Sequence, residues 1–328
     1  GYYSSKDPFG KNGDFITSPT ISDLFSEIIG IWLISAWEKM GKPKIFNFVE
    51  LGPGDGSLTK VIISTLKKFP ELNRAIKIYL YEKSLFLKKL QMQNIDNKRI
   101  KWIKNFNSIK KGPVIFFGNE FFDAIPIKQF SNINNELFEK CYSVKDDIDI
   151  IEKFIRSNKK DVAQIMTFGT LKKLKFIEFP KKGLIELNPI IKKINKLSGG
   201  ILLIDYGYSK SNNSNTIQAV MGNKKISTEK MLKNLGKADI TSLVNFNLLK
   251  EYFLKNNLKV KKVVTQRFFL ERMGIIERAH ILEKKRTNEE QKYMKETLSR
   301  LLEEKQMGSL FKVIFGYKNK NNNFFGFE

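Results

Sequence analysis

The chain has 328 residues, which is enough for one large domain or for a domain that carries an insertion. Hydrophobic residues make up 41% of it and aromatic residues 12%, as is typical of a globular protein with a sizeable core. A single cysteine, Cys141, and a single histidine, His280, exclude an internal disulfide framework and a Cys/His metal site, so we expect no metal. No uninterrupted apolar run reaches the roughly 18 residues of a membrane-spanning helix, so no membrane span is predicted.

Lysine and arginine outnumber aspartate and glutamate by 58 to 34, which gives a formal net charge of +24. Such a surplus is compatible with a basic face that binds nucleic acid or an acidic membrane. Lysine is, however, spread along the whole chain beside abundant asparagine, isoleucine and phenylalanine, which indicates a compositional bias. The sequence has no dense basic block and no basic-aromatic signature of an RNA-binding module. We therefore expect no nucleic-acid partner.

The predicted elements begin with an irregular loop over residues 1–19, rich in glycine, serine and proline, and a helix from about residue 21 to 40. Strands and helices then alternate to about residue 117, which predicts βαβ units and a parallel sheet. Residues 127–179 lack that pattern and are interpreted as an insertion, with one or two antiparallel strands in 137–144. The later elements are a helix over 187–197, a strand over 201–204, a helix over 242–255, a strand over 260–265, helices over 275–304 and a strand over 310–317.

The most informative stretch is residues 46–57, where a short apolar strand is followed by Glu50 and by three glycines, Gly52, Gly54 and Gly56. This order places a glycine-rich turn at the carboxyl end of a parallel strand, where open α/β sheets bind nucleotide-like ligands. Residues without a Cβ allow such a tight turn and a close approach of backbone to ligand. The spacing matches neither the dinucleotide fingerprint nor a Walker loop. It resembles motif I of the class I S-adenosylmethionine (SAM) methyltransferases; a structural turn in another α/β protein is the alternative.

Two later strands add candidates for the same ligand. Glu82 directly follows the apolar strand 76–81, near the usual offset of an acidic residue that binds ribose hydroxyls. The alternative is a solvated acidic residue at the start of the next helix. Asn105 and Phe106 follow the strand 100–103, where such folds often contact an adenine ring, although an aromatic residue there more often packs in the core.

The fourth strand, 114–117, leads into a loop that carries two carboxylates, Glu120 and Asp123, beside two phenylalanines. In a doubly wound sheet this loop lies next to the glycine-rich turn. Carboxylates bind a guanidinium group by paired hydrogen bonds, and an aromatic ring packs against a sulfonium or guanidinium cation. Glu120 and Asp123 are therefore the predicted catalytic residues. The alternative for both is to cap a helix that starts nearby.

Several sequence blocks, found in the expected order, resemble the MidA-type family of SAM-dependent methyltransferases. That family includes a mitochondrial protein-arginine methyltransferase that acts as an assembly factor of respiratory complex I. The resemblance implies a class I Rossmann-like fold, an α/β doubly wound sheet with an inserted substrate-side region. It also implies SAM as cofactor and symmetric dimethylation of an arginine in the large core subunit of complex I. The blocks are residues 10–19, 50–56, 119–126, 205–207, 236–241 and 307–312.

The same resemblance assigns further residues to the cofactor. The N-terminal loop is expected to fold over SAM, with Asp14, Thr17 and Ser18 near its amino-acid end, although these residues also read as the start of a helix. Asn119 is placed with Glu50, the three glycines and Glu82 among the cofactor-binding residues. The expected domains are 1–45, which covers the cofactor site, 46–126, the SAM-binding half, 127–199, the substrate-side insertion, and 200–328, the second half of the sheet.

Two other functions are kept as alternatives to protein-arginine methylation. The charge of +24 motivates an RNA methyltransferase, and the glycine-rich turn is equally compatible with a non-catalytic assembly factor that binds SAM. The amino-acid bias and the lack of a visible transit peptide predict a bacterial cytoplasm, with the mitochondrial matrix as the alternative. The expected partner is a protein substrate, and a homodimer is left open.

Overall fold

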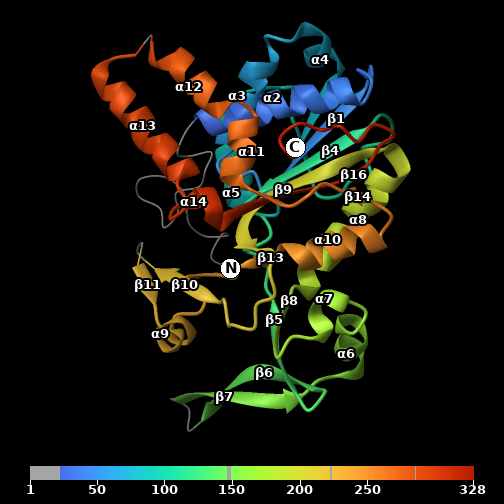
Figure 1. The fold of residues 1–328 in the computed structure, drawn as a ribbon, viewed down its shortest axis with the longest axis vertical. Coiled ribbons are helices and arrows are strands. Elements are labelled where there is room, and N and C mark those ends of the chain that lie inside the picture. The colour runs from blue at the N-terminus through green and yellow to red at the C-terminus, as the bar shows by residue number, and fades with distance from the viewer. Residues whose placement is uncertain (1–22, 146–148, 222–223, 285) are drawn as a thin grey trace.

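A mostly parallel sheet forms the centre of the molecule (Figure 1). The computed structural model describes residues 23–145, 149–221, 224–284 and 286–328. The strands follow the order β14-β16-β9-β4-β1-β2-β3, and β3, β2, β1, β4 and β9 run parallel. The order reverses between β1 and β4, and such a switch point opens a ligand crevice at the carboxyl ends of the strands. The parallel strands are β1 (Phe46–Leu51), β2 (Ile76–Tyr81), β3 (Lys101–Ile103), β4 (Val114–Asn119) and β9 (Gly199–Tyr208).

Helices cover both faces of this sheet, which confirms the predicted doubly wound α/β fold. On one face, α2 (Asp23–Lys39), α3 (Ser57–Leu66) and α11 (Gln266–Arg272) share a hydrophobic core with the sheet. On the other, α8 (Lys181–Leu197) and α10 (Phe246–Lys255) pack in a second core. Figure 1 shows the two layers on opposite sides of β9 and β4. Further helices around the main sheet are α4 (Pro70–Ala75), α5 (Leu85–Asn94), α12 (Ile275–Glu283), α13 (Asn288–Leu302) and α14 (Met307–Leu310).

The segment between β4 and β9 contains a second, antiparallel sheet that lies below the main sheet in Figure 1. Its strand order is β7-β6-β5-β8, with the two helices α6 and α7 between β7 and β8. The sequence predicted one or two strands here. The additional strands were missed because β5 pairs with β8, more than 40 residues later, and local patterns do not report such pairing. The bounds are β5 (Lys128–Ile133), β6 (Glu136–Lys145), β7 (Asp149–Arg156), α6 (Lys159–Ile165), α7 (Gly169–Lys172) and β8 (Phe176–Phe179).

Helix α8 begins at Lys181 rather than near residue 187 as expected. Gly183, in the first turn of this helix, serves close packing. A Cβ at Gly183 would lie only 2.4 Å from Cζ of Phe122, so a larger residue would push the helix away from the loop after β4. Because α8 begins at Lys181, its first two turns lie beside the carboxyl ends of the parallel strands.

A small three-stranded sheet with one helix forms an arm between β9 and α10. Its strands follow the order β11-β10-β12, and a few apolar residues, among them Ala219, Met231 and Ala238, form its own core. Figure 1 shows the arm beside the antiparallel sheet of the insertion. Its elements are β10 (Gln218–Met221), β11 (Lys224–Ile226), α9 (Thr228–Lys233) and β12 (Asp239–Thr241), followed by β13 (Val244–Asn245), which pairs with β9.

Strand β16 (Phe311–Lys318) runs antiparallel to β9 and connects it to two short strands, β14 (Lys259–Val260) and β15 (Val264–Thr265). The single strand predicted over 260–265 is thus split in two. Residues after β16 return to α2, where the Trp32 indole N–H donates to the carbonyl of Phe325 at 3.3 Å. Segments from opposite halves of the sequence therefore complete one core.

Candidate functional site

The turn after β1 depends on its glycines. Gly52, Gly54 and Gly56 have φ of 62°, 56° and 88°, a left-handed conformation that side chains disfavour. Space is also restricted, because a Cβ at Gly56 would lie 2.6 Å from Cδ1 of Ile95. Gly56 immediately precedes α3, so the turn delivers the chain from the end of β1 into a helix N-terminus. The backbone of the turn is thereby left uncovered toward the crevice.

Glu50 lies at the carboxyl end of β1, and its side chain is buried. The Thr59 hydroxyl, from the first turn of α3, donates a hydrogen bond to it. Burial is the main cause that raises the pKa of Glu50 to about 8, and the nearby carboxylates of Asp55 and Glu82 raise it further against the effect of Thr59. Glu50 is therefore protonated near neutral pH. Its buried side chain links the end of β1 to α3 through Thr59 and does not place a negative charge in the crevice.

Glu82 follows β2 and is fixed by two donors. The backbone N–H of Ser84 donates to Oε1 at 2.7 Å, and Nε2 of Gln91 donates to Oε2 at 3.2 Å. Burial raises the pKa of Glu82, while these hydrogen bonds oppose the rise. Gln91 also donates to the carbonyl of Gly54 at 2.8 Å. Gln91 of α5 thus connects the glycine turn to Glu82 and fixes the distance between them.

A cavity of about 320 Å³ opens at this edge of the sheet. It brings together Gly52, Gly54, Glu82 and Glu120, four residues that the sequence singled out. The remaining lining residues come from the end of β2, from α5, from the loop after β4 and from α8. They are Tyr81, Lys83, Leu87, Phe121, Ala124, Ile125, Pro126, Lys182 and Glu186.

Glu120 reaches the cavity wall through an uncommon backbone conformation, with φ of +50°. A residue with a side chain pays roughly 1–3 kcal/mol for such a conformation, and it persists where surrounding contacts enforce it. The N–H of Glu120 donates to the carbonyl of Ile204 at 2.9 Å, and the Asn119 amide donates to Oε1 of Glu120 at 3.0 Å. The buried Oδ1 of Asn119 has no hydrogen-bond partner within the described ranges, so it can accept one from a ligand.

Asp123 lies on the same loop but outside the cavity lining, among groups from β9 and the arm. Burial is the main cause that raises the pKa of Asp123 to about 6; a hydrogen bond with Tyr206 lowers it, and the charge of Asp239 raises it. The neighbouring Asp205 is buried as well, and its pKa is raised by burial and by Asp123. The two predicted catalytic carboxylates thus face different surroundings: Glu120 the cavity, and Asp123 a buried acidic cluster.

The sequence missed the contribution of α8 to the cavity. Oε1 of Glu186 lies 2.6 Å from Nζ of Lys83, and the Tyr81 hydroxyl donates to Oε2 of Glu186 at 3.1 Å. These contacts attach the helix to the end of β2. No local signal marks Glu186 or Lys182, because they occupy ordinary polar positions of an amphipathic helix. Asn105 and Phe106 line a separate cavity of about 320 Å³ with Tyr81 and several lysines, and Phe106 is largely buried in the core.

Three predicted cofactor residues, Asp14, Thr17 and Ser18, lie outside the described residues. Their roles remain predictions. Among the residues that the structure does describe, no group of three or more histidine, cysteine or acidic side chains could hold a metal ion. In the same residues, none of the helices has the length and apolar character to cross a membrane.

Residues 28–264 match the model of a family described as "Putative S-adenosyl-L-methionine-dependent methyltransferase", and the chain belongs to this family. Among curated proteins it is similar to "Protein arginine methyltransferase NDUFAF7, mitochondrial" of Xenopus laevis, with 29% identity over 95% of this chain and 76% of the relative. The Caenorhabditis elegans homolog of the same name is 30% identical over 95% of this chain and 78% of the relative.

The fold also matches a crystal structure from Burkholderia thailandensis that contains bound S-adenosyl-homocysteine. The TM-score is 0.80 at 18% identity, and the match covers 100% of this chain and 84% of that chain. This likeness shows a shared fold. The family identifies the chain as a SAM-dependent methyltransferase whose cofactor is SAM.

The residues of the cavity fit this cofactor. Gly52 and Gly54 expose backbone on one wall, Glu82 places a fixed carboxylate at the end of β2, and Leu87 and Phe121 add apolar surface. A carboxylate at this place accepts hydrogen bonds from ribose hydroxyls in nucleotide-binding α/β folds. Glu120 and Phe121, neighbours in the chain, line the same cavity.

Proposed function

We propose that this methyltransferase methylates arginine in a protein, by symmetric dimethylation, and that its acceptor is the large core subunit of respiratory complex I. The names of the curated relatives, protein arginine methyltransferase, support the acceptor chemistry. Their designation as mitochondrial supports the matrix, the alternative to a bacterial cytoplasm, as the compartment. The observation that carries the proposal is Glu120, a carboxylate in an enforced left-handed conformation on the cofactor cavity.

The chemistry needs a bound acceptor and a place for one proton. SAM, when bound, supplies an electrophilic methyl group on a sulfonium. Glu120 binds the guanidinium by charge-assisted hydrogen bonds and holds its nitrogen in line with the methyl carbon. Asp123, three residues further along the same loop but outside the cavity, is ionised above about pH 6 and is the proposed final acceptor of the proton that the nitrogen releases, which reaches it by way of solvent.

The proposed cofactor contacts follow from the same geometry. The backbone at Gly52 and Gly54 lies against the amino-acid part of SAM, and Glu82 accepts from the ribose hydroxyls. Glu50 and Gly56 maintain the turn, and Asn119 offers its unpartnered Oδ1. We keep Asp14, Thr17 and Ser18 as proposed contacts to the amino-acid end of SAM.

The test is to incubate the chain with methyl-labelled SAM and the large core subunit of complex I, and to map the label by peptide mass spectrometry. Label on an arginine is expected. Glu120→Gln should reduce the rate by about 10- to 100-fold, because a hydrogen bond to a charged group contributes about 1.5–3 kcal/mol. Full activity of Glu120→Gln would remove Glu120 from its role.

A matched control is Glu251→Gln. Glu251 accepts hydrogen bonds from Gly169 and Thr170 away from the cofactor cavity, so the rate should be unchanged. Label that is removed by ribonuclease rather than protease would instead establish an RNA methyltransferase. SAM binding without transfer to any partner would favour the non-catalytic assembly factor.

A further inference from the structure

The carboxylate of Asp205, near the carboxyl end of β9, accepts hydrogen bonds from the backbone of the loop after β4 and of its own strand. Its Oδ2 accepts hydrogen bonds from the N–H of Phe122 at 2.8 Å and of Asp123 at 3.2 Å. Its Oδ1 accepts from the N–H of Tyr206 at 3.0 Å. The side chain is only 1% exposed, so these contacts replace its hydration. Asp205 therefore connects β9 to the loop that follows the neighbouring parallel strand β4.

The loop that Asp205 holds is the one that carries Glu120. The β4–β9 ladder is extended by the hydrogen bond from the N–H of Glu120 to Ile204. The chain then turns through the positive φ of Glu120 and continues into the two N–H groups that Asp205 binds. A loop fixed on both sides of a strained residue can maintain that strain, whereas a free loop would relax it.

The same loop also touches the glycine turn. A Cβ added at Gly52 would lie 3.2 Å from Cδ2 of Phe121, so the aromatic ring already packs closely over this glycine. On the other side, a Cβ at Gly118 would lie 3.1 Å from Cβ of Phe121. Phe121 has little freedom as long as the following N–H groups stay in place. The orientation of Glu120 thus depends on the packing of Phe121 and on the hydrogen bonds that Asp205 accepts from the next two residues.

We propose that Asp205 is a positioning residue for methyl transfer: by binding the N–H groups of Phe122 and Asp123, it holds the loop so that Glu120 faces the cofactor cavity. The inference rests on the proposed role of Glu120 in binding the acceptor. A buried carboxylate beside Asp123 and Glu120 is electrostatically costly. The backbone N–H groups of Phe122 and Asp123 oppose this effect and favour the ionised form of Asp205, whose charge-assisted hydrogen bonds hold a loop more firmly than neutral ones.

The test compares Asp205→Asn with the unmodified chain in three measurements. Asparagine keeps the size of the side chain but has one neutral acceptor oxygen, so the hydrogen bonds from Phe122 and Asp123 are weakened if that oxygen faces them and lost if the NH2 group does. Amide hydrogen exchange at Phe122 and Asp123 should become faster. SAM affinity by calorimetry should fall much less than kcat, because Asp205 reaches the glycine turn only through Phe121, whereas it holds the loop of Glu120 directly. The kcat for methyl transfer should fall by about 10- to 100-fold, the loss expected from a misplaced catalytic group.

Two further variants separate positioning from general damage. If Asp205 acts through Glu120, the double variant of Asp205→Asn with Glu120→Gln should be no slower than Glu120→Gln alone. Thr287→Ala removes the capping box of α13, remote from the cavity, and should lower thermal stability without changing kcat. Asp205→Ser is the replacement if the asparagine variant does not fold, because it removes the acceptor without adding a donor.

The outcomes distinguish this inference from the proposed function. If the unmodified chain labels no arginine, the proposed acceptor is wrong, and the exchange rates at Phe122 and Asp123 still decide whether Asp205 holds the loop. Unchanged exchange, unchanged kcat or additive effects in the double variant would overturn the positioning role. Failure of both Asp205 variants to fold would assign the residue to the stability of the fold and would overturn it too.

Discussion

A substitution of the single residue Gly54 tests whether the glycine turn binds SAM. It lines the cofactor cavity with φ of 56°, so an alanine there is strained by about 1–2 kcal/mol and adds a methyl group to the turn that SAM contacts. We expect Gly54→Ala to weaken SAM binding by about tenfold or more. Gly41→Ala is the matched control, since Gly41 has φ of 84° after α2 with no atom within 4 Å of the added Cβ. Equal SAM affinity of the two variants in calorimetry would contradict the cofactor assignment.

Glu50 makes the stability of the protein depend on pH. Its pKa is about 8 in the folded chain against 4.5 for an exposed group, so the folded state binds the extra proton between these values. The free energy of unfolding should therefore fall as pH rises from about 4.5 to 8, at up to about 1.4 kcal/mol per unit, and level off above. Glu50→Gln should lose most of this slope. Urea denaturation at several pH values checks it; identical slopes would place Glu50 in contact with solvent.

Asp123 should set the acid limit of activity. Its pKa of about 6 means that the carboxylate that accepts a proton becomes protonated below that pH. We expect kcat/KM to decrease as pH falls through about 6, and Asp123→Asn to be slow with a flat profile in this range. A pH–rate profile of the unmodified chain without an inflection near 6 would exclude Asp123 as the proton acceptor.

Single residues also show what the sequence could predict about the site. Gly52, Gly54, Glu82 and Glu120 were found because each directly follows a strand, and the ends of parallel strands meet at one edge. Glu186 carries no such mark, and Tyr206 and Asp239 were found only within the blocks of the family resemblance, without a role of their own. All three join the site through contacts between elements that are about 100 residues apart, which a local pattern does not contain.

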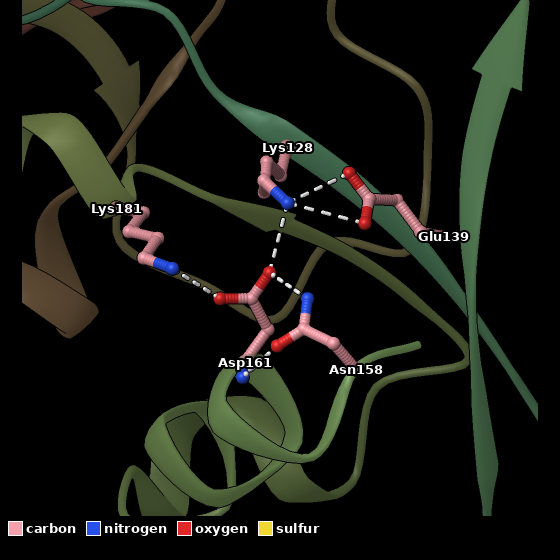
Figure 2. Close-up of polar contacts among 5 residues, drawn as sticks. All are labelled: Lys128, Glu139, Asn158, Asp161 and Lys181. Atoms are coloured by element: carbon pink, nitrogen blue, oxygen red, sulfur yellow. Dashed lines mark hydrogen bonds and ion pairs between the residues drawn. The ribbon is translucent and has the colours of Figure 1, made fainter. Parts of the chain in front are cut away.

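Helix α8 is held at its N-terminus by a buried network of charged groups (Figure 2). Asp161 from α6 has no exposed side-chain surface and accepts from Lys128 of β5 at 2.8 Å and Lys181 of α8 at 2.5 Å. Asn158 donates to Asp161 at 2.8 Å, and Glu139 of β6 pairs with Lys128 at 2.9 Å. The insertion is thereby attached to the helix that carries Lys182 and Glu186 to the cofactor cavity.

Asp161→Asn should therefore destabilise the protein by about 1–3 kcal/mol at neutral pH, because two lysines lose a buried charged partner. Burial alone would raise the pKa of Asp161, but the hydrogen bonds from Lys128, Lys181 and Asn158 outweigh it and hold the pKa well below its usual value. This stability is present above pH 4 and is lost as pH falls further. Denaturant titrations at pH 7 and at low pH measure both effects.

An exposed ion pair provides the control for this network. Glu229 and Lys233 lie 2.7 Å apart on α9 with most of their side-chain surface in solvent. Glu229→Gln should change the free energy of unfolding by no more than about 0.5 kcal/mol. If the Asp161 and Glu229 variants lost a similar free energy of unfolding, burial would not strengthen the ion pairs of Asp161.

At the level of elements, the sequence predicted the regular parts and missed the irregular ones. The βαβ units up to β4 follow from apolar runs and turn residues that lie close together in the chain. The antiparallel sheet of the insertion, the arm and the early start of α8 depend on contacts such as that of Gly183 with Phe122. A glycine in a sequence marks a break or a close approach equally well, and only the packed structure decides between them.

At the scale of the whole molecule, the net charge of +24 should produce weak binding to RNA that depends on salt. Because the lysines are spread over the chain, we expect affinity for a random RNA to fall steeply between about 50 and 200 mM salt, without transfer of label. Fluorescence anisotropy with a labelled RNA measures this. Salt-resistant binding or methylated RNA would instead support a nucleic-acid substrate.

The joining of early and late segments has a consequence for how the chain is synthesised. Trp32 and Phe325 are separated by 293 positions, and the core around α2 includes Phe315 and Phe324. At roughly 5–20 residues per second, a ribosome needs about 15–60 s to cover this distance. During that time the early elements α3 and β1 can already pack against α2, but the part of its apolar face that Phe315 and Phe324 cover stays exposed, and β9 lacks β16 as its neighbour. We therefore expect the nascent methyltransferase to expose apolar surface until residues 311–327 emerge.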